Sequence, residues 1–142
     1  MIFTSIPDLM PYLLVTLEVG LISIVTGSIL GAFLAWAKLS SYRCLRMVAN
    51  GYTYIIRCTP SIVLLFIVFY GLPKWMEYSF DIDMDDLSRA IFVIITFTLL
   101  FGAYVSEVFR SAYQSIPKGQ YEAAVTVGLS PLQAVLHIMV PQ

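Results

Sequence analysis

Long apolar intervals separated by short polar ones make up most of this chain. The apolar intervals are residues 19–37, 47–73 and 90–106, and the second contains a single charge, Arg57. A helix needs about 20 predominantly apolar residues to cross the hydrocarbon core of a bilayer. Each interval is close to that length or longer, so the pattern predicts three membrane-spanning helices.

A fourth apolar stretch, residues 129–140, differs from the other three. It contains Pro131 and His137 and is shorter than a complete span requires. We therefore expect it to be the start of a fourth span. The predicted fold is all-α: a polytopic transmembrane helical bundle that forms one domain over residues 1–142 and is incomplete at its C-terminal end.

The composition requires a lipid environment. Hydrophobic residues make up 59% of the chain and charged residues 12%, and the mean hydropathy is +0.85. A soluble domain of this size would need more polar residues to cover its surface. The net charge of -1 provides no basic surface for a nucleic acid, so we expect no nucleic-acid partner.

The sequence carries no signature of catalysis or metal binding. It has no Gly-x-x-x-x-Gly-Lys phosphate loop and no cluster of metal ligands, and His137 is its single histidine. We therefore expect no metal site and no cofactor in this chain. It is predicted not to be an enzyme and not to hydrolyse ATP itself.

Basic residues are unevenly distributed between the two ends of the predicted spans. One end has Lys38, Arg43, Arg46, Arg110 and Lys118, whereas the other has only Lys74 and Arg89. The side richer in Lys and Arg is normally the cytosolic one. Residues 38–46 and 118–128 are therefore predicted to lie in the cytosol, with residues 74–89 and the N-terminus outside. Cys44 and Cys58 then lie on the reducing side, where a disulfide is not expected.

Small residues recur at every fourth position of the first span, at Ser23, Gly27, Gly31 and Ala35. Such a stripe lets a second helix approach closely, and it predicts a helix-packing face. The partner is either another span of the same chain, which we favour, or a second subunit.

A cation and a proline lie close together within the second apolar interval. Pro60 removes a backbone hydrogen bond, so the helix is expected to kink or open near Thr59 and Pro60. Arg57 either faces the interior of the bundle and pairs with another group, or extends to the cytosolic interface as an anchor. The sequence favours neither alternative.

Two acidic positions lie at the edges of apolar intervals. Glu107 and Arg110 are spaced i, i+3 at the end of the third interval, which predicts an ion pair on one helix face. Glu18 precedes the first uncharged interval. We expect it to lie among lipid headgroups, and the alternative is a contact with a cationic substrate.

The polar segment after the third span is predicted to form a break, a short helix and a turn. Residues 120–127 can form about two helical turns, and Gly128 is suited to end them because glycine accepts a left-handed backbone. Ala123 and Ala124 keep this helix slim enough to enter a groove. Glu122 supplies a carboxylate that a partner can bind.

Residues 115–142, SIPKGQYEAAVTVGLSPLQAVLHIMVPQ, resemble the EAA loop of the permease subunits of bacterial ATP-binding-cassette importers, and most of all the branch that imports polar amino acids. Residues 103–110 continue the resemblance. Residues 57–73 are similar to the Arg-Gly-Thr-Pro signature of this family and its Gly-Leu-Pro end, with Cys58 where the family usually has glycine.

This resemblance implies a membrane-spanning subunit that moves a polar amino acid across the bacterial cytoplasmic (inner) membrane by alternating access. Glu122, Ala123, Ala124 and Gly128 match the helix that couples such subunits to a cytosolic ATPase. ATP and magnesium would be bound by that ATPase. The other implied partners are a second permease subunit, identical or paralogous, and an extracytoplasmic substrate-binding protein. The family's permeases are longer, so the chain is expected to be a truncated five-span domain.

Other functions remain compatible with the same spans. One is a small multi-span scaffold or channel-like protein that needs no ATPase, and another is a permease fragment without transport of its own. A phosphate-loop ATPase and a secreted binding protein encoded beside the gene would favour the importer.

Overall fold

The computed structural model describes residues 6–84 and 86–141, and all regular secondary structure in these residues is helical. The elements are α1 (Ile6–Leu39), α2 (Arg43–Cys58), α3 (Ser61–Phe66), the π-helical turn η1 (Ile67–Gly71), α4 (Leu72–Phe80), α5 (Arg89–Ser115), α6 (Lys118–Thr126), α7 (Pro131–Ala134) and the π-helical turn η2 (Val135–Met139). The N-terminus itself, predicted to lie outside the cell, is not among the described residues.

Three helical segments in the described part of the chain are long and apolar enough to cross a membrane. They are Met10–Leu39, Ser61–Phe80 and Arg89–Ser115. The predicted all-α fold with three spans is therefore confirmed. Many large apolar side chains on these helices are exposed, such as Leu14 and Ile29 on α1, which is the pattern of a surface covered by lipid.

The boundaries of the second span differ from the prediction. Residues 47–73 do not form one helix, because α2 ends at Cys58 and a new helix begins at Ser61. Thr59 has an extended backbone (φ -91°, ψ 124°), the conformation that the residue before a proline prefers. The membrane-crossing segment therefore starts after Pro60, and α2 is a separate amphipathic helix.

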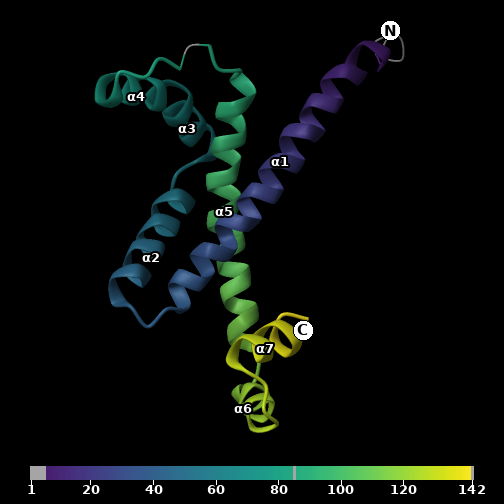
Figure 1. The fold of residues 1–142 in the computed structure, drawn as a ribbon. Coiled ribbons are helices and arrows are strands. Elements are labelled where there is room, and N and C mark those ends of the chain that lie inside the picture. Colours follow the sequence, from purple (N-terminus) through teal and green to yellow (C-terminus); the bar gives the residue numbers. More distant parts are fainter. Residues whose placement is uncertain (1–5, 85, 142) are drawn as a thin grey trace.

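The two longest helices, α1 and α5, cross each other at glycines and form the frame of the molecule (Figure 1). A Cβ atom added to Gly27 would lie 2.9 Å from Cδ1 of Phe101, and one added to Gly102 would lie 2.9 Å from Cδ2 of Leu30. Side chains at these two positions would therefore push the helices apart, and the absence of Cβ atoms permits the close crossing.

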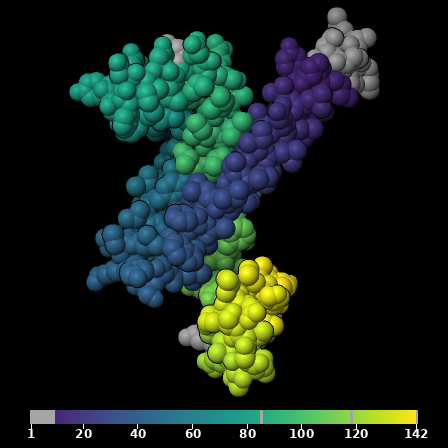
Figure 2. Space-filling view, in the orientation of Figure 1, coloured from purple at the N-terminus to yellow at the C-terminus, as the bar shows by residue number. Residues whose placement is uncertain are grey.

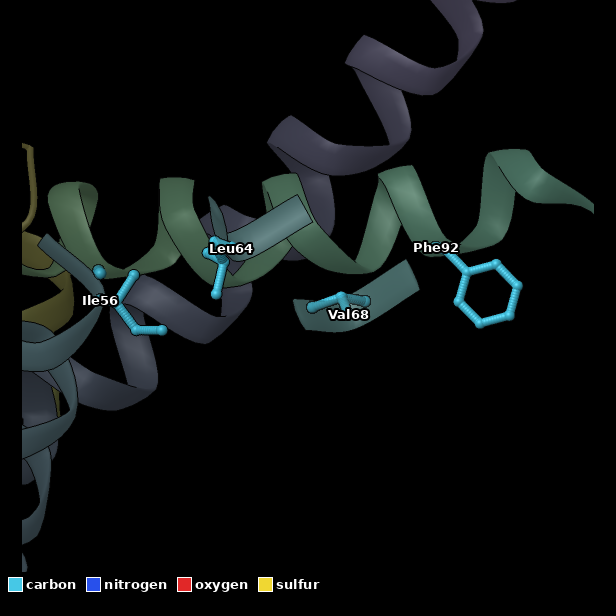
Figure 3. Close-up of a cluster of buried hydrophobic side chains, with 5 residues drawn as sticks. Ile56, Leu64, Val68 and Phe92 are labelled. Carbon is cyan, nitrogen blue, oxygen red and sulfur yellow. The ribbon is translucent and has the colours of Figure 1, made fainter. Parts of the chain in front are cut away.

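The apolar core lies where α2, α3 and η1 pack against α5. Figure 3 shows Ile56, Leu64, Val68 and Phe92 of this cluster, in which Ala103 is also buried. A smaller cluster, made of Leu34, Ala37 and Ala49, joins the end of α1 to α2. Together these clusters hold α2 against the frame, although α2 does not itself qualify as a span.

The predicted cytosolic segments gather at one end of the molecule. In Figure 1 the connection between α1 and α2 and the helix α6 lie at the lower end, whereas α4 and the connection from α4 to α5 lie at the upper end. Figure 2 shows residues from α6 to the end of η2 as a separate yellow lobe beyond the lower end of α5. The lobe is thus displayed away from the body of the bundle.

Candidate functional site

The short helix α6 is defined by its two ends. Pro117 precedes it with an extended backbone (φ -59°, ψ 131°), and this separates α6 from α5. At the other end Gly128 has φ +93°, which a residue with a side chain rarely adopts. The amide of Leu129 donates to the carbonyl of Ala124 at 3.1 Å, and that of Gly128 donates to Val125 at 3.0 Å. This pair of bonds is the Schellman motif, so glycine ends α6 as predicted.

One face of α6 packs against the following segment and the other is free. Ala124 is buried, as are Ala134 of α7 and Met139 of η2. Glu122, Ala123 and Val127 are exposed. Of the two alanines expected to keep the helix slim, Ala123 is therefore available to a partner, whereas Ala124 packs within the lobe.

A capping box fixes the turn that follows α6. The amide of Ser130 donates to Oε1 of Gln133 at 2.9 Å, and the amide of Gln133 donates to Oγ of Ser130 at 3.3 Å. This feature was not predicted, although Ser-x-x-Gln with Pro131 at the first helical position is its usual sequence signature. The turn at Gly128 is therefore held on both sides by hydrogen bonds.

The expected pair of Glu107 and Arg110 belongs to a larger charge cluster at the lower end of the frame. Nη2 of Arg110 lies 2.8 Å from Oε2 of Glu107, and Nζ of Lys38 lies 2.8 Å from Oε1. Lys38 also donates to Oγ of Ser106 at 3.0 Å, and Arg110 donates to Gln114. One carboxylate thus binds two cations, one from α1 and one from α5.

Lys38, predicted to lie in the polar stretch that follows the first span, is part of α1 instead. α1 continues to Leu39, and the side chain of Lys38 is only 1% exposed. The missed signal was its position on the helix, because Lys38 follows Gly31 and Ala35 along the stripe that faces α5. A long side chain there reaches the neighbouring helix.

The stripe of small residues faces α5 of the same chain. Ser23, Gly27, Gly31 and Ala35 are all buried. A Cβ on Gly31 would lie 3.1 Å from Cγ1 of Val105, so this position is also tightly packed, although less restrictive than Gly27. The stripe therefore serves a crossing within the chain, which is the alternative that we favoured.

Arg57, Thr59 and Pro60 lie at the junction between α2 and α3. Arg57 is exposed, and its guanidinium carbon lies 5.3 Å from the centre of the Tyr104 ring of α5, a cation–π distance. Oγ1 of Thr59 donates to the carbonyl of Ile55 at 2.8 Å. The structure does not bring these residues to the charge cluster or to α6.

The remaining sequence candidates lie apart from both sites. Glu18 is exposed on α1 near the upper end of the bundle. Cys44 and Cys58 are free and exposed. Among the described residues, no group of His, Cys, Asp and Glu could hold a metal ion.

Comparisons with known proteins agree with this architecture. The profile of the family described as "Binding-protein-dependent transport system inner membrane component" matches residues 27–142. The histidine/lysine/arginine/ornithine transport system permease protein HisQ of Salmonella typhimurium is 39% identical over 131 residues, which cover 90% of this chain and 58% of that protein. The L-cystine transport system permease protein TcyL of Bacillus subtilis is 37% identical over 142 residues, 100% of this chain and 59% of that protein.

A solved structure has the same fold. It is a crystal structure of an amino acid ABC transporter with histidines, with a TM-score of 0.70 and 25% identity over 95% of this chain and 63% of that one. The chain thus spans less than two thirds of the length of these relatives. Since the family profile covers most of its residues, the chain belongs to the family of inner membrane components of binding-protein-dependent transport systems.

Proposed function

We propose that this chain acts in the membrane-spanning subunit of an ATP-driven importer, which moves a polar amino acid across the bacterial cytoplasmic membrane by alternating access. The observation that carries the proposal is α6, a short helix closed by Gly128 and displayed beyond the end of α5, in a chain of this family (Figure 2). A helix in this position is accessible to a partner outside the membrane.

The geometry supports a coupling role for α6. The exposed Ala123 leaves room for a groove to close around the helix, and the exposed Glu122 offers a carboxylate to a basic or amide donor of the partner. α6 follows α5 after the break at Pro117, and α5 crosses α1 at closely packed glycines. A displacement of α6 would reach α5 through the connection at Pro117, and α5 would carry it to the crossing because tightly packed helices move as stiff bodies.

The partners follow from this role. A cytosolic ATPase binds α6 and supplies ATP and magnesium, and a second permease subunit, identical or paralogous, provides the other half of the pathway. An extracytoplasmic binding protein delivers the substrate. Closure of the ATPase dimer brings the two α6 helices together and switches the side on which the pathway opens. The names of HisQ and TcyL, which refer to basic amino acids and to cystine, support a polar amino acid as the substrate.

The coupling role is tested with variants of α6, coexpressed with a candidate partner ATPase. Gly128→Asp introduces a side chain at a left-handed position and a charge at the turn, so it should reduce copurification of the ATPase and uptake of labelled amino acid. Glu122→Ala should reduce both more mildly, because one charge-assisted hydrogen bond contributes about 1.5 to 3 kcal/mol at most. The amount of protein in the membrane should stay unchanged.

The matched control is Glu77→Ala, which removes an exposed carboxylate from α4 at the opposite end of the bundle. It should leave copurification of the ATPase unchanged. Full ATPase binding and full uptake in both α6 variants would show that α6 is only a solvated connector, as the scaffold alternative requires.

A further inference from the structure

A polar cavity lies where the end of α1, the start of α2 and the lower part of α5 meet. Its volume is about 440 Å³, and its polar lining consists of Lys38, Arg46, Asn50, Glu107, Arg110 and Gln114. The charge cluster described above forms one wall, and the exposed first turns of α2 form the other. The cavity is separate from α6.

The lining has an excess of positive charge. Among the described residues that line it, Glu107 is the only carboxylate, and its two oxygens already bind Lys38 and Arg110. Arg46 faces the same cavity, is exposed, and forms no ion pair with a described residue. The three cations against one anion leave an uncompensated charge, and this favours an anionic ligand.

Several hydrogen-bond donors remain free for such a ligand. The guanidinium of Arg46 has its full set of donors, which match the oxygens of a phosphate in pairs. Asn50 lies four residues further on α2, hence on the same face, and has an amide that can donate. The ammonium of Lys38 has three protons and binds two acceptors in the structure.

The surroundings favour a lipid as the source of the anion. The cavity lies at the ends of two membrane-crossing segments, where the headgroups of a bilayer are found. The helices that carry its lining also have exposed large apolar side chains, including Trp36 on α1 and Met47 on α2, so acyl chains have a surface to cover. Basic pockets between transmembrane helices are known to bind anionic headgroups.

We propose that this cavity is a binding site for the phosphate of an anionic phospholipid, with Arg46 as its main free ligand. The bound headgroup joins α2 to the charge cluster between α1 and α5. The site does not depend on the transport function, because it is defined by the charges and the position of the cavity alone.

The proposal is tested by lipid binding to the purified, delipidated protein, measured by native mass spectrometry with phosphatidylglycerol. The expected result is saturable binding that phosphatidylcholine does not reproduce. Arg46→Gln should weaken the affinity about tenfold, as expected for the loss of a charge-assisted contact. Arg46→Lys should restore part of the affinity because it keeps the charge but not the paired geometry.

The matched control is Arg43→Gln, which removes an equal charge from the first turn of the same helix. The side chain of Arg43 does not line the cavity. It should leave the affinity almost unchanged. Equal effects of the two substitutions would overturn the proposal, since they would show only a general attraction to anionic lipid. Displacement of the lipid by millimolar inorganic phosphate would also overturn it, because the ligand would then be a soluble anion.

Discussion

Replacing Glu107 by Gln should destabilise the bundle more than replacing Lys38 by Met, because the two changes leave different charges behind. Without the carboxylate, the ammonium of Lys38, whose side chain is 1% exposed, and the guanidinium of Arg110 face each other with no counter-ion. A buried charge that loses its partner costs about 3 to 5 kcal/mol in the free energy of unfolding. Without Lys38, Glu107 still binds Arg110 at 2.8 Å, so the loss is about 1.5 to 3 kcal/mol.

The double variant Lys38→Met/Glu107→Gln provides a stricter test. It removes both members of the buried pair, so no unpaired ammonium remains, and its cost should be clearly smaller than the sum of the two single costs. The free energy of unfolding is measured by denaturant titration in mixed micelles, with Glu77→Gln on the exposed face of α4 as the control. A Lys38 variant as damaging as the Glu107 variant, or strict additivity, would refute the reasoning.

Two further predictions concern the helix crossing and the topology. Gly27→Ala should lower the thermal midpoint of unfolding in detergent, because its Cβ would lie 2.9 Å from Cδ1 of Phe101, at a cost of about 1 to 3 kcal/mol. Gly20→Ala is the control and should leave the midpoint unchanged, since its Cβ would have no atom within 4 Å. Equal midpoints for the two variants would contradict the packing of α1 against α5. In intact cells with no other cysteine in the chain, an impermeant thiol reagent should label Ser79→Cys but not Ser130→Cys, and the reverse result would invert the proposed orientation.

Features set by local sequence could be predicted. Runs of apolar residues specify the number of spans, because the thickness of the bilayer fixes the required length. Gly128 could be assigned to the end of α6 because its left-handed backbone depends on the residue itself. The crossing glycines of α1 could be predicted because their spacing places them on one helix face.

Features that depend on a distant contact could not be predicted. A charge at the end of an apolar run normally marks a loop. The position of Lys38 on the small-residue stripe indicates that it faces a neighbouring helix, but it does not show that Ser106 and Glu107 will receive its ammonium. The second span was predicted to start at residue 47, but it starts at Ser61, and the reason for this error is local. The residues before Pro60 are apolar enough to continue a span, but the extended backbone at Thr59 ends α2 first.

The central claim is that α6 binds an ATPase, and protection of a cysteine at Val127, the residue that caps the C-terminal end of this helix, tests it most directly. In a chain with Cys44 and Cys58 replaced by serine, Val127→Cys and Tyr42→Cys provide matched sites, since the native side chains are 79% and 77% exposed. Labelling in inverted membrane vesicles is measured with and without the candidate partner ATPase. The account predicts that the ATPase protects Val127→Cys and leaves Tyr42→Cys reactive. Equal labelling of Val127→Cys with and without the ATPase would contradict the account.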